Sequence, residues 1–292
     1  MINKRYALGK VLSVGSSSEG NAYYIEIHRK GYPTPFGLLI EAGFPYNELS
    51  RRLLNYGVSM RNVNAVLVTH EHHDHSLAVK ELVERGKKVY APLSVFKHWG
   101  LEDKVTSRNI FEVGKTKLIA DGIDVVAFKV EHDVETVGFI ITIRGDWGEH
   151  RIFFATDTSY IRYNFFKYTF ETIMIEANNT RRVLYYAIKN AKENGDKWGE
   201  IHFDRVLRTH FLIENTIKTL IGSKSNAGFN LSKTDNIYLL HSSASSNTNH
   251  MEIKMMLVNA LKESKLFRME KHGEKVYKLP HVHIFLKNGE IM

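Results

Sequence analysis

A run of histidines follows an apolar segment in "AVLVTHEHHDH", residues 65–75. The apolar part predicts a buried strand, so the polar residues lie on a loop at the strand exit. His70 and His72, two residues apart, can project together, whereas the adjacent Asp74 and His75 cannot easily join them on one small ion. The spacing therefore predicts two metal sites side by side. Imidazole and carboxylate are ligands that Zn²⁺ accepts, and Mn²⁺ or Fe would also be tolerated.

A surface loop that is merely rich in histidine is the alternative, but solvation does not explain four ligand-type residues at one strand exit. The composition agrees with a metal site, because the 292 residues include 15 histidines and no cysteine. Disulfides, thiolate nucleophiles and cysteine metal sites are excluded, so any metal must be held by histidine and carboxylates. The net charge of +8 at pH 7 favours anionic partners such as phosphates, nucleic acid or a membrane surface.

Two strand-rich blocks, residues 10–41 and 115–155, are each followed by helices. We therefore predict an α/β fold in which two sheets pack together with helices outside, as one four-layered domain over residues 1–292. The polar segments 193–200 and 222–230 are predicted to be mobile loops. Helices are expected over residues 46–56, 76–85, 214–221 and 247–261 and from 181, and buried strands over 63–68, 172–175 and 236–240.

The HxHxDH pattern after an apolar strand resembles the metallo-β-lactamase superfamily, whose αββα sandwich matches the predicted layers. Its phosphodiesterase and nuclease branch is similar in three further segments, in the same order along the chain. "KVEHDVETVGFII" points to His132, "FFATDTSY" to Asp157 and "IYLLHSSAS" to His241. Alone, each residue would be interpreted as structural. The resemblance implies one ion held by His70, His72 and His132, a second held by Asp74, His75 and His241, and Asp157 as the bridge between them.

The same resemblance implies hydrolysis, since two divalent ions, Zn²⁺ or alternatively Mn²⁺, supply a bridging hydroxide near neutral pH. "TIMIEANN" and "RTHFLIENTI" resemble motifs of tRNase Z-like and YycJ-like members. They imply that His210 is the acid that protonates the leaving oxygen and that Glu176 orients it, with Asp74 as a further catalytic residue. The alternative is that His210 simply ends a helix and Glu176 a strand.

Three residues are predicted to contact substrate. Asn178 belongs to the "TIMIEANN" motif, and Ser17 and Asn21 belong to "VGSSSEGNAYYIE", which resembles the hairpin of YycJ-type and related phage proteins. A Gly/Ser hairpin is also common as a purely structural element. His73 points away from its neighbours and is predicted not to be a ligand.

This sequence departs from the family pattern at Glu41, Asn179 and Arg208-Thr209. These departures put substrate choice in doubt and leave the predicted ligands in place.

The short spacings indicate a small substrate. About 25 residues separate His132 from Asp157, too few for a tRNA-binding arm, and about 84 separate Asp157 from His241, too few for an extra β-CASP domain. A basic stripe with interleaved aromatic residues is not obvious in the sequence. The closest resemblance is to phage anti-Pycsar phosphodiesterases, which implies hydrolysis of cyclic mononucleotides to monophosphates for immune evasion. A YycJ-like nuclease acting on DNA or RNA is the alternative, and an inactive binding protein on the same fold is a third hypothesis.

The N-terminal residues lack the apolar core of a signal peptide, and no apolar run approaches the roughly 20 residues of a membrane span. We expect a soluble, cytoplasmic protein without a membrane partner, in the host cytoplasm if a phage encodes it. The family resemblance further implies a homodimer in which residues 222–230 close the partner's site.

Overall fold

The computed structural model describes residues 8–29, 31–145, 148–223, 226–241, 249–264, 266, 268–271, 274–277, 279–287 and 290–292. Its contacts divide the chain into two compact units. The first unit contains residues 1–129, 134–151 and 286–291, and the second contains residues 130–133, 152–285 and 292. The prediction of a single domain therefore stays a prediction.

The first unit contains a five-stranded sheet in the order β1-β2-β3-β4-β5. The pairs β1–β2 and β2–β3 are antiparallel, whereas β3–β4 and β4–β5 are parallel. The sequence explains the parallel part, because strands buried on both faces consist of near-continuous apolar residues. The strands are Leu8–Ser17 (β1), Gly20–Ile27 (β2), Phe36–Ile40 (β3), Val63–Leu67 (β4) and Val89–Tyr90 (β5).

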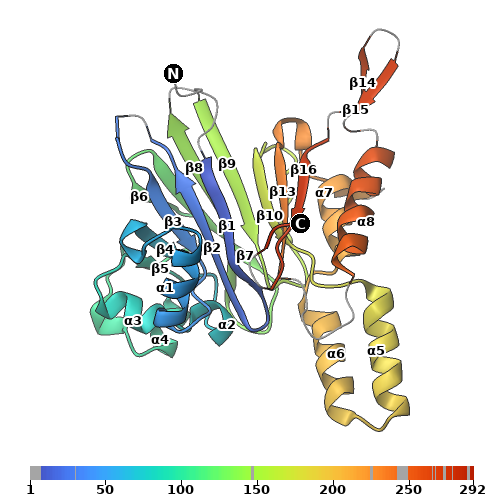
Figure 1. Ribbon diagram of the computed structural model, residues 1–292, viewed down its shortest axis with the longest axis horizontal. Helices are drawn as coiled ribbons and strands as arrows, with labels where there is room; N and C mark the ends of the chain where they lie inside the picture. The colour runs from blue at the N-terminus through green and yellow to red at the C-terminus, as the bar shows by residue number, and fades with distance from the viewer. Residues whose placement is uncertain are drawn as a thin grey trace. The chain divides into compact units, whose positions relative to one another are not determined.

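Helices of the first unit lie beside this sheet (Figure 1). Leu49 and Leu53 of α1, Leu82 of α3 and Phe96 of α4 are buried in one apolar core together with residues of the strands. The helices are Tyr46–Asn55 (α1), His73–Ser76 (α2), Val79–Glu84 (α3) and Leu93–His98 (α4), with short 3-10 turns at Met60–Asn62 and Glu102–Lys104.

A second, seven-stranded sheet has the order β16-β13-β10-β9-β8-β7-β6. In the second unit β10 pairs in parallel with β9 and β13, and β13 pairs in parallel with β16. All five residues of β10 are buried, so the residue that ends it is held inside the protein. The strands are Thr116–Ala120 (β6), Ile123–Val130 (β7), Thr136–Gly145 (β8), Gly148–Ala155 (β9), Thr172–Glu176 (β10), Asn236–Leu240 (β13) and His281–Ile284 (β16).

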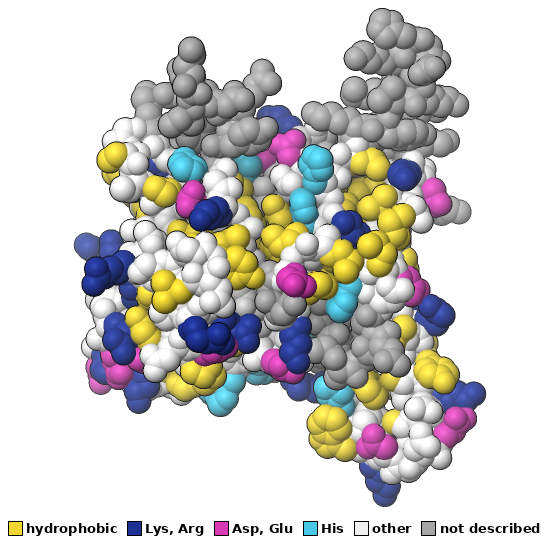
Figure 2. All heavy atoms as spheres, in the orientation of Figure 1, with side chains coloured by type: hydrophobic (Ala, Val, Ile, Leu, Met, Phe, Trp, Pro, Cys, Tyr) yellow, Lys and Arg dark blue, Asp and Glu magenta, His cyan; other side chains and the backbone are white. Residues whose placement is uncertain are grey.

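The second unit adds four helices, of which α5 and α6 lie side by side as a hairpin (Figure 1). Each begins at a side-chain cap, since Thr180 accepts from the N–H of Val183 and Asp196 accepts from that of Gly199. Figure 2 shows hydrophobic side chains at the surface of this hairpin. The helices are Arg181–Glu193 (α5), Lys197–Thr209 (α6), Ile213–Ile221 (α7) and His250–Glu263 (α8).

The predicted α/β class, with two sheets and helices, is confirmed, and most predicted elements are present within a few residues. The expected loop over residues 193–200 is present only at 194–196, because α5 ends at Glu193 and α6 begins at Lys197. Gly199 is the only buried residue of α6, and a glycine near the start of a helix is a poor helix signal in a sequence. The segment 222–230 contains two short paired strands, Gly222–Ser223 (β11) and Asn226–Ala227 (β12), before the buried Phe229.

Three small elements complete the described chain, namely a 3-10 turn at Leu231–Lys233 and the paired strands Arg268–Lys271 (β14) and Glu274–Tyr277 (β15). Among the described residues, no helix is both long enough and apolar enough to span a membrane.

Candidate active site

The predicted histidine loop is in part a helical turn. His72 precedes the first turn of α2, and Asp74 and His75 lie within that helix. The turn is held against the loop after β3, where the N–H of Ala42 donates to the carbonyl of His75 over 2.8 Å. Gly43 permits this close approach, because a Cβ there would lie 1.8 Å from the carbonyl oxygen of Asp74.

A chain of hydrogen bonds fixes the protonation of His70. The hydroxyl of Thr69 donates to Glu41 Oε1 over 2.6 Å, and the Thr69 N–H donates to Glu41 Oε2 over 3.2 Å. Because the Thr69 proton is used in this way, the 2.8 Å contact between Thr69 Oγ1 and His70 Nδ1 requires Nδ1–H to be the donor. His70 Nε2 is therefore left with a lone pair, the form that binds a metal.

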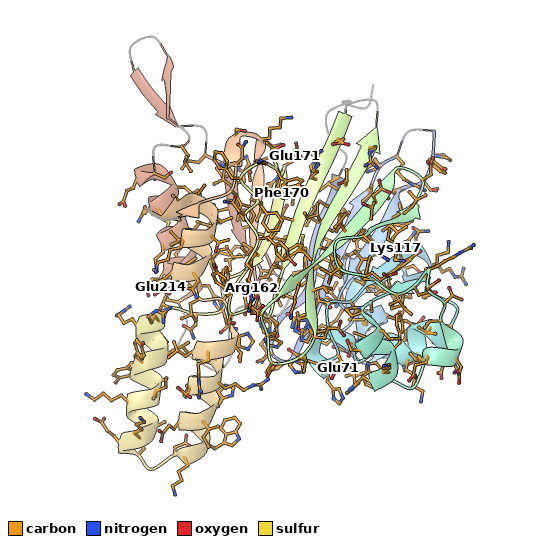
Figure 3. The ribbon with its side chains drawn as sticks, turned by 180° about the vertical axis from the view of Figure 1, so that it is seen from behind. Glu71, Lys117, Arg162, Phe170, Glu171 and Glu214 are labelled. Carbon is orange, nitrogen blue, oxygen red and sulfur yellow. The ribbon has the colours of Figure 1, made fainter. Side chains whose placement is uncertain are left out.

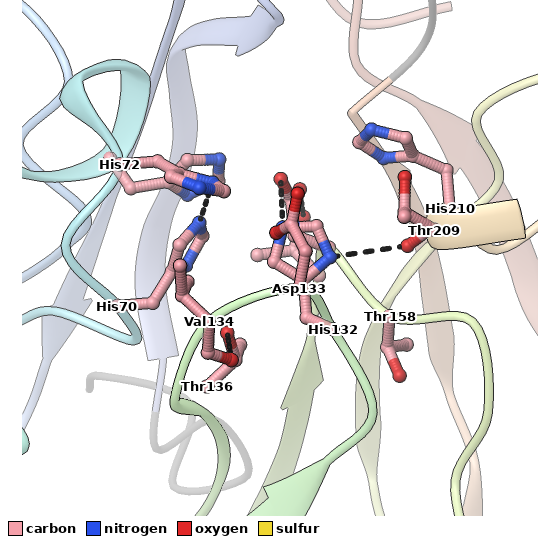
Figure 4. Close-up of polar contacts among 12 residues, drawn as sticks. His70, His72, His132, Asp133, Val134, Thr136, Thr158, Thr209 and His210 are labelled. Atoms are coloured by element: carbon pink, nitrogen blue, oxygen red, sulfur yellow. Dashed lines mark hydrogen bonds and ion pairs between the residues drawn. The ribbon is translucent and has the colours of Figure 1, made fainter. Parts of the chain in front are cut away.

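His70 and His72 present their nitrogens to one point. His70 Nε2 lies 3.1 Å from His72 Nδ1, and their rings meet edge to face (Figure 4). Two nitrogen ligands about 2.0–2.1 Å from a tetrahedral Zn²⁺ lie about 3.4 Å apart, so the pair has the spacing of two ligands of one ion.

Asn21 lies against the other two predicted ligands of this turn. Its Nδ2 is 3.1 Å from His75 Nε2 and 3.5 Å from Asp74 Oδ2, while its Oδ1 accepts from the hydroxyl of Tyr23 over 3.1 Å. Asn21 and Ser17 are both buried, and the Ser17 hydroxyl accepts from the N–H of Glu19. These contacts favour positioning roles, and substrate contact by Ser17 and Asn21 stays a prediction.

The second unit gathers a carboxylate and two imidazoles at the end of β10, which we name the Glu176 cluster (Glu176, His210 and His241). Glu176 is fully buried, and its Oε1 lies 2.8 Å from His210 Nδ1 and 3.2 Å from His241 Nδ1. Its Oε2 accepts from the N–H of Thr158 over 3.1 Å. His210 Nδ1–H donates to this carboxylate, whereas the Nδ1–H of His241 is shared between Glu176 and Asp157, so the Nε2 atoms of both histidines face away from Glu176.

Electrostatics keep Glu176 ionised. Burial raises the pKa of Glu176, but the charge of His210 and the hydrogen bonds from His210 and His241 outweigh burial and hold the pKa below its ordinary value. The His210 side chain is 13% exposed, whereas that of His241 is 1% exposed. His210 is therefore the member of the cluster that a reactant can reach.

His132 is fixed in the same tautomer by a different partner. Its Nδ1 lies 3.2 Å from the carbonyl oxygen of Thr209, which can only accept, so Nδ1 carries a proton (Figure 4). His132 Nε2 then faces carboxylate oxygens of Asp133 at 3.0 Å and Asp157 at 3.8 Å. The two carboxylates would stabilise a cation at Nε2, either a second proton or a metal ion.

Asp157 joins this group through His241. Asp157 Oδ1 lies 2.9 Å from His241 Nδ1, and Asp157, Glu176, His210 and His241 each offer a ligand atom within 4.8 Å of the others. Carboxylate oxygens and imidazole nitrogens at this spacing form a donor set that divalent metals accept.

Backbone strain marks the same positions. Among the described residues, the non-glycine residues with positive φ are Glu41 at 65°, Asp157 at 45° and His241 at 52°. Each follows a strand end, of β3, β9 and β13 respectively. Left-handed backbone at such residues costs about 1–3 kcal/mol and is concentrated at functional sites in proteins.

Asn178 has one polar atom without a described partner. Its Nδ2 donates to the carbonyl of His241 over 2.9 Å, and its N–H donates to that of Phe211. Within the described part of the chain, its buried Oδ1 accepts no hydrogen bond. An unsatisfied acceptor in this position supports the predicted substrate contact without testing it.

His73, predicted not to be a ligand, packs against Trp99, and its exclusion from the metal sites stays a prediction. It is exposed, and its ring stacks on Trp99 with centroids 5.3 Å apart. The sequence interpretation did not find the roles of Glu41, Thr69 and Thr158. A charged residue directly after the wholly apolar strand "FGLLI" was a usable signal for Glu41.

Comparison with known proteins gives a family match over more than half of the chain. Residues 38–222 match the model of the β-lactamase superfamily domain. The exodeoxyribonuclease WalJ of Streptococcus pneumoniae is 30% identical over 155 residues, which are 51% of this chain and 54% of that protein. The chain thus spans about half the length of this curated relative.

Solved structures with a similar fold cover nearly the whole chain. The metallo-β-lactamase fold protein YhfI from Bacillus subtilis has a TM-score of 0.57 at 17% identity, with 97% of each chain covered. Unliganded yeast PDE1 has a TM-score of 0.60 at 11% identity, with 97% of this chain and 100% of that chain covered. At these identities the likeness shows the fold alone.

Proposed function

Because the chain belongs to the β-lactamase superfamily, we propose that it is a metal-dependent phosphodiesterase. The observation that carries the proposal is the 2.8 Å contact between Glu176 and His210, which presents an accessible imidazole beside donors suited to a metal. Hydrolysis of a phosphodiester needs such a group, because the departing alkoxide leaves poorly unless it is protonated.

The donor chemistry fits two divalent ions, with Zn²⁺ first and Mn²⁺ as an alternative. His70 and His72 have the mutual spacing of ligands to one ion, and Asp157 and His241 lie beside each other in the second unit. When bound, such ions lower the pKa of a coordinated water and neutralise phosphate charge. The family resemblance implies that His70, His72 and His132 would hold one ion and Asp74, His75 and His241 the other, with Asp157 shared, and this assignment stays a prediction.

Protein side chains supply the remaining steps. His210 Nε2–H gives its proton to the leaving oxygen, while Nδ1–H stays bonded to Glu176. The carboxylate of Glu176 orients the ring and stabilises the imidazolium before the transfer. Thr158, which donates its N–H to Glu176 Oε2, holds the carboxylate in place.

A DNA strand is the first substrate to test, because WalJ is described as an exodeoxyribonuclease. Cyclic mononucleotides are the second candidate, favoured by the short spacing of about 25 residues between His132 and Asp157. The charge of +8 suits either phosphate-bearing substrate. Homodimer formation and a role for residues 222–230 in the partner's site stay predictions.

Parallel incubations separate these candidates. The metal-loaded protein is mixed with labelled single-stranded DNA or RNA and, separately, with cyclic CMP, UMP, AMP and GMP. Turnover of a polymer alone supports the nuclease, and turnover of a cyclic nucleotide alone supports the second candidate. Failure on all of these and on bis-p-nitrophenyl phosphate, with less than one equivalent of metal bound, would contradict both and support an inactive binding protein.

A further inference from the structure

The segment after Asp157, residues 158–170, presents aromatic rings to solvent, and we name it the aromatic loop. Tyr160 is 56%, Phe166 54% and Tyr168 49% exposed, and Tyr163 is 43% exposed. Exposed rings at this density within one short segment are unusual, because large apolar side chains are normally buried or scattered. The sequence interpretation, which found no obvious basic stripe with interleaved aromatic residues, did not single out this segment.

Buried neighbours hold the loop in place. Phe165 and Phe170 are buried, and both contact Phe153 and Phe229 through their rings. Tyr168 packs on this aromatic core, and its ring is stacked with that of Phe170 at a distance of 6.4 Å between the ring centroids. The exposed rings are therefore attached to a fixed base, which lowers the entropy cost of binding a flat partner.

The loop is also basic. Residues 158–170 contain Arg162 and Lys167 and no acidic residue. Arg162 is 71% exposed and pairs with Glu131 over 2.8 Å. Exposed pairs of this kind contribute little stability, so the guanidinium can exchange Glu131 for a phosphate at little cost.

The loop is continuous with the Glu176 cluster. It begins at Thr158, whose N–H donates to Glu176 Oε2. Arg162 reaches Glu131, the neighbour of the predicted ligand His132. Arg162 and Phe170, both labelled in Figure 3, bracket most of the loop in the sequence. Three of its four exposed rings lie between them. A strand bound along the loop would thus have one end beside His210.

We propose that the aromatic loop binds a single-stranded nucleic acid, with bases stacked on Tyr160, Tyr163, Phe166 and Tyr168 and phosphates placed at Arg162 and Lys167. Aromatic stacking with nearby cations binds single strands with little sequence preference, because every base has a flat face. This inference rests on the proposed phosphodiesterase function and selects a polymer as its substrate.

Binding is measured separately from hydrolysis. Fluorescence anisotropy of a labelled phosphorothioate oligothymidine, whose backbone resists hydrolysis, is recorded with the full metal-loaded chain. The Tyr160→Ala/Phe166→Ala double variant is expected to bind at least about 20-fold more weakly, because each lost stack weakens binding about 5- to 150-fold. Phe166→Trp is expected to retain binding, since it keeps a flat ring.

Matched controls come from the α5–α6 hairpin. Tyr186, 71% exposed on α5, controls for the loss of a surface ring, and Tyr186→Ala is expected to bind like the unaltered protein. Arg182, 77% exposed and paired with Glu252, controls for Arg162. Arg162→Ala is expected to reduce the salt dependence of binding by about 0.7 in log–log slope, and Arg182→Ala to leave it unchanged.

Unchanged binding by the double variant, with an unchanged melting temperature, overturns the inference, as does an equal loss in Tyr186→Ala. A change from dimer to monomer in sedimentation with unchanged binding also overturns it, because the loop would then contact a second copy of the chain. Hydrolysis of bis-p-nitrophenyl phosphate by the unaltered protein is measured in parallel. Its absence contradicts the proposed function while leaving the binding result intact.

Discussion

Glu176 Oε1 lies 2.8 Å from His210 Nδ1, inside the protein on the carboxylate side and at the surface on the imidazole side. The buried carboxylate of Glu176 thus orients the partly exposed imidazole of His210 and stabilises its protonated form. The partial exposure of His210, 13% against 1% for His241, is the structural reason to treat His210 as the acid.

Replacing His210 tests that role. His210→Ala is expected to retain bound metal and to lose about 10²- to 10⁴-fold in kcat on unactivated esters. Loss on p-nitrophenyl esters is expected to be much smaller, because p-nitrophenolate leaves without a proton. Metal content and kcat on both ester types are the measurements, and equal losses on the two would show that His210 is not the acid.

Asp157→Ala is expected to behave differently, with metal and activity lost together. The carboxylate lies 2.9 Å from His241 Nδ1 and 3.8 Å from His132 Nε2, so its removal takes a negative group from both imidazoles. Metal content by elemental analysis, read beside turnover, checks this. A variant that keeps full metal content and activity would contradict the assigned bridging role.

Thr69→Val removes the hydroxyl between Glu41 and His70. Without an acceptor on Nδ1, His70 is no longer fixed in the metal-binding tautomer, and metal affinity is expected to fall about 10- to 100-fold. Thr69→Ser should restore it.

The matched control is Thr234→Val, a buried threonine whose hydroxyl donates to the carbonyl of Phe170. It loses a comparable hydrogen bond and should retain metal affinity. Metal titrations measure the affinity of both variants. If Thr69→Val and Thr234→Val lose equal metal affinity, the Thr69 effect is general destabilisation and not loss of the His70 tautomer.

His283 predicts a pH dependence of stability. Burial, together with His281 and Lys254, holds the pKa of His283 below its ordinary value of 6.5. Its contribution to stability is therefore present above pH 6.5 and is lost as the pH falls toward the pKa of the folded state. Urea unfolding at about pH 7.5 and about pH 5.5 measures the difference in unfolding free energy between the two pH values. His283→Gln should make that difference smaller. If His283→Gln leaves the difference in unfolding free energy between the two pH values unchanged, His283 is not the source of the pH dependence.

Helices and strands were predicted well from the sequence where the pattern of apolar residues is strongly periodic. The strands at residues 63–67 and 236–240 coincide with apolar runs, and α1 coincides with a helical pattern of leucines. α6 was not predicted because its first turn lies in the polar, glycine-bearing segment 193–200, which was interpreted as a loop. The break between α2 and α3 was not predicted because histidine has no strong helical preference.

For the candidate site, the order of the motifs along the chain identified the residues, but it could not predict which residues would be their hydrogen-bond partners. The bond from Thr69 to Glu41 joins residues 28 positions apart, and the one from His210 to Glu176 joins residues 34 apart. Such pairs depend on which strands become neighbours. The aromatic loop was readable as "YIRYNFFKYTF", but only the fold separates the buried Phe165 and Phe170 from the exposed Tyr160 and Phe166.

The left-handed backbone at Glu41, Asp157 and His241 has a consequence for handling the protein. At about 1 kcal/mol or more each, the three positions together use up a sizeable part of the roughly 5–15 kcal/mol that keeps a domain folded. Ligands that bind only the folded chain raise its stability by mass action. Yield and shelf life should therefore follow divalent-metal supply, and chelators in lysis buffers should promote aggregation.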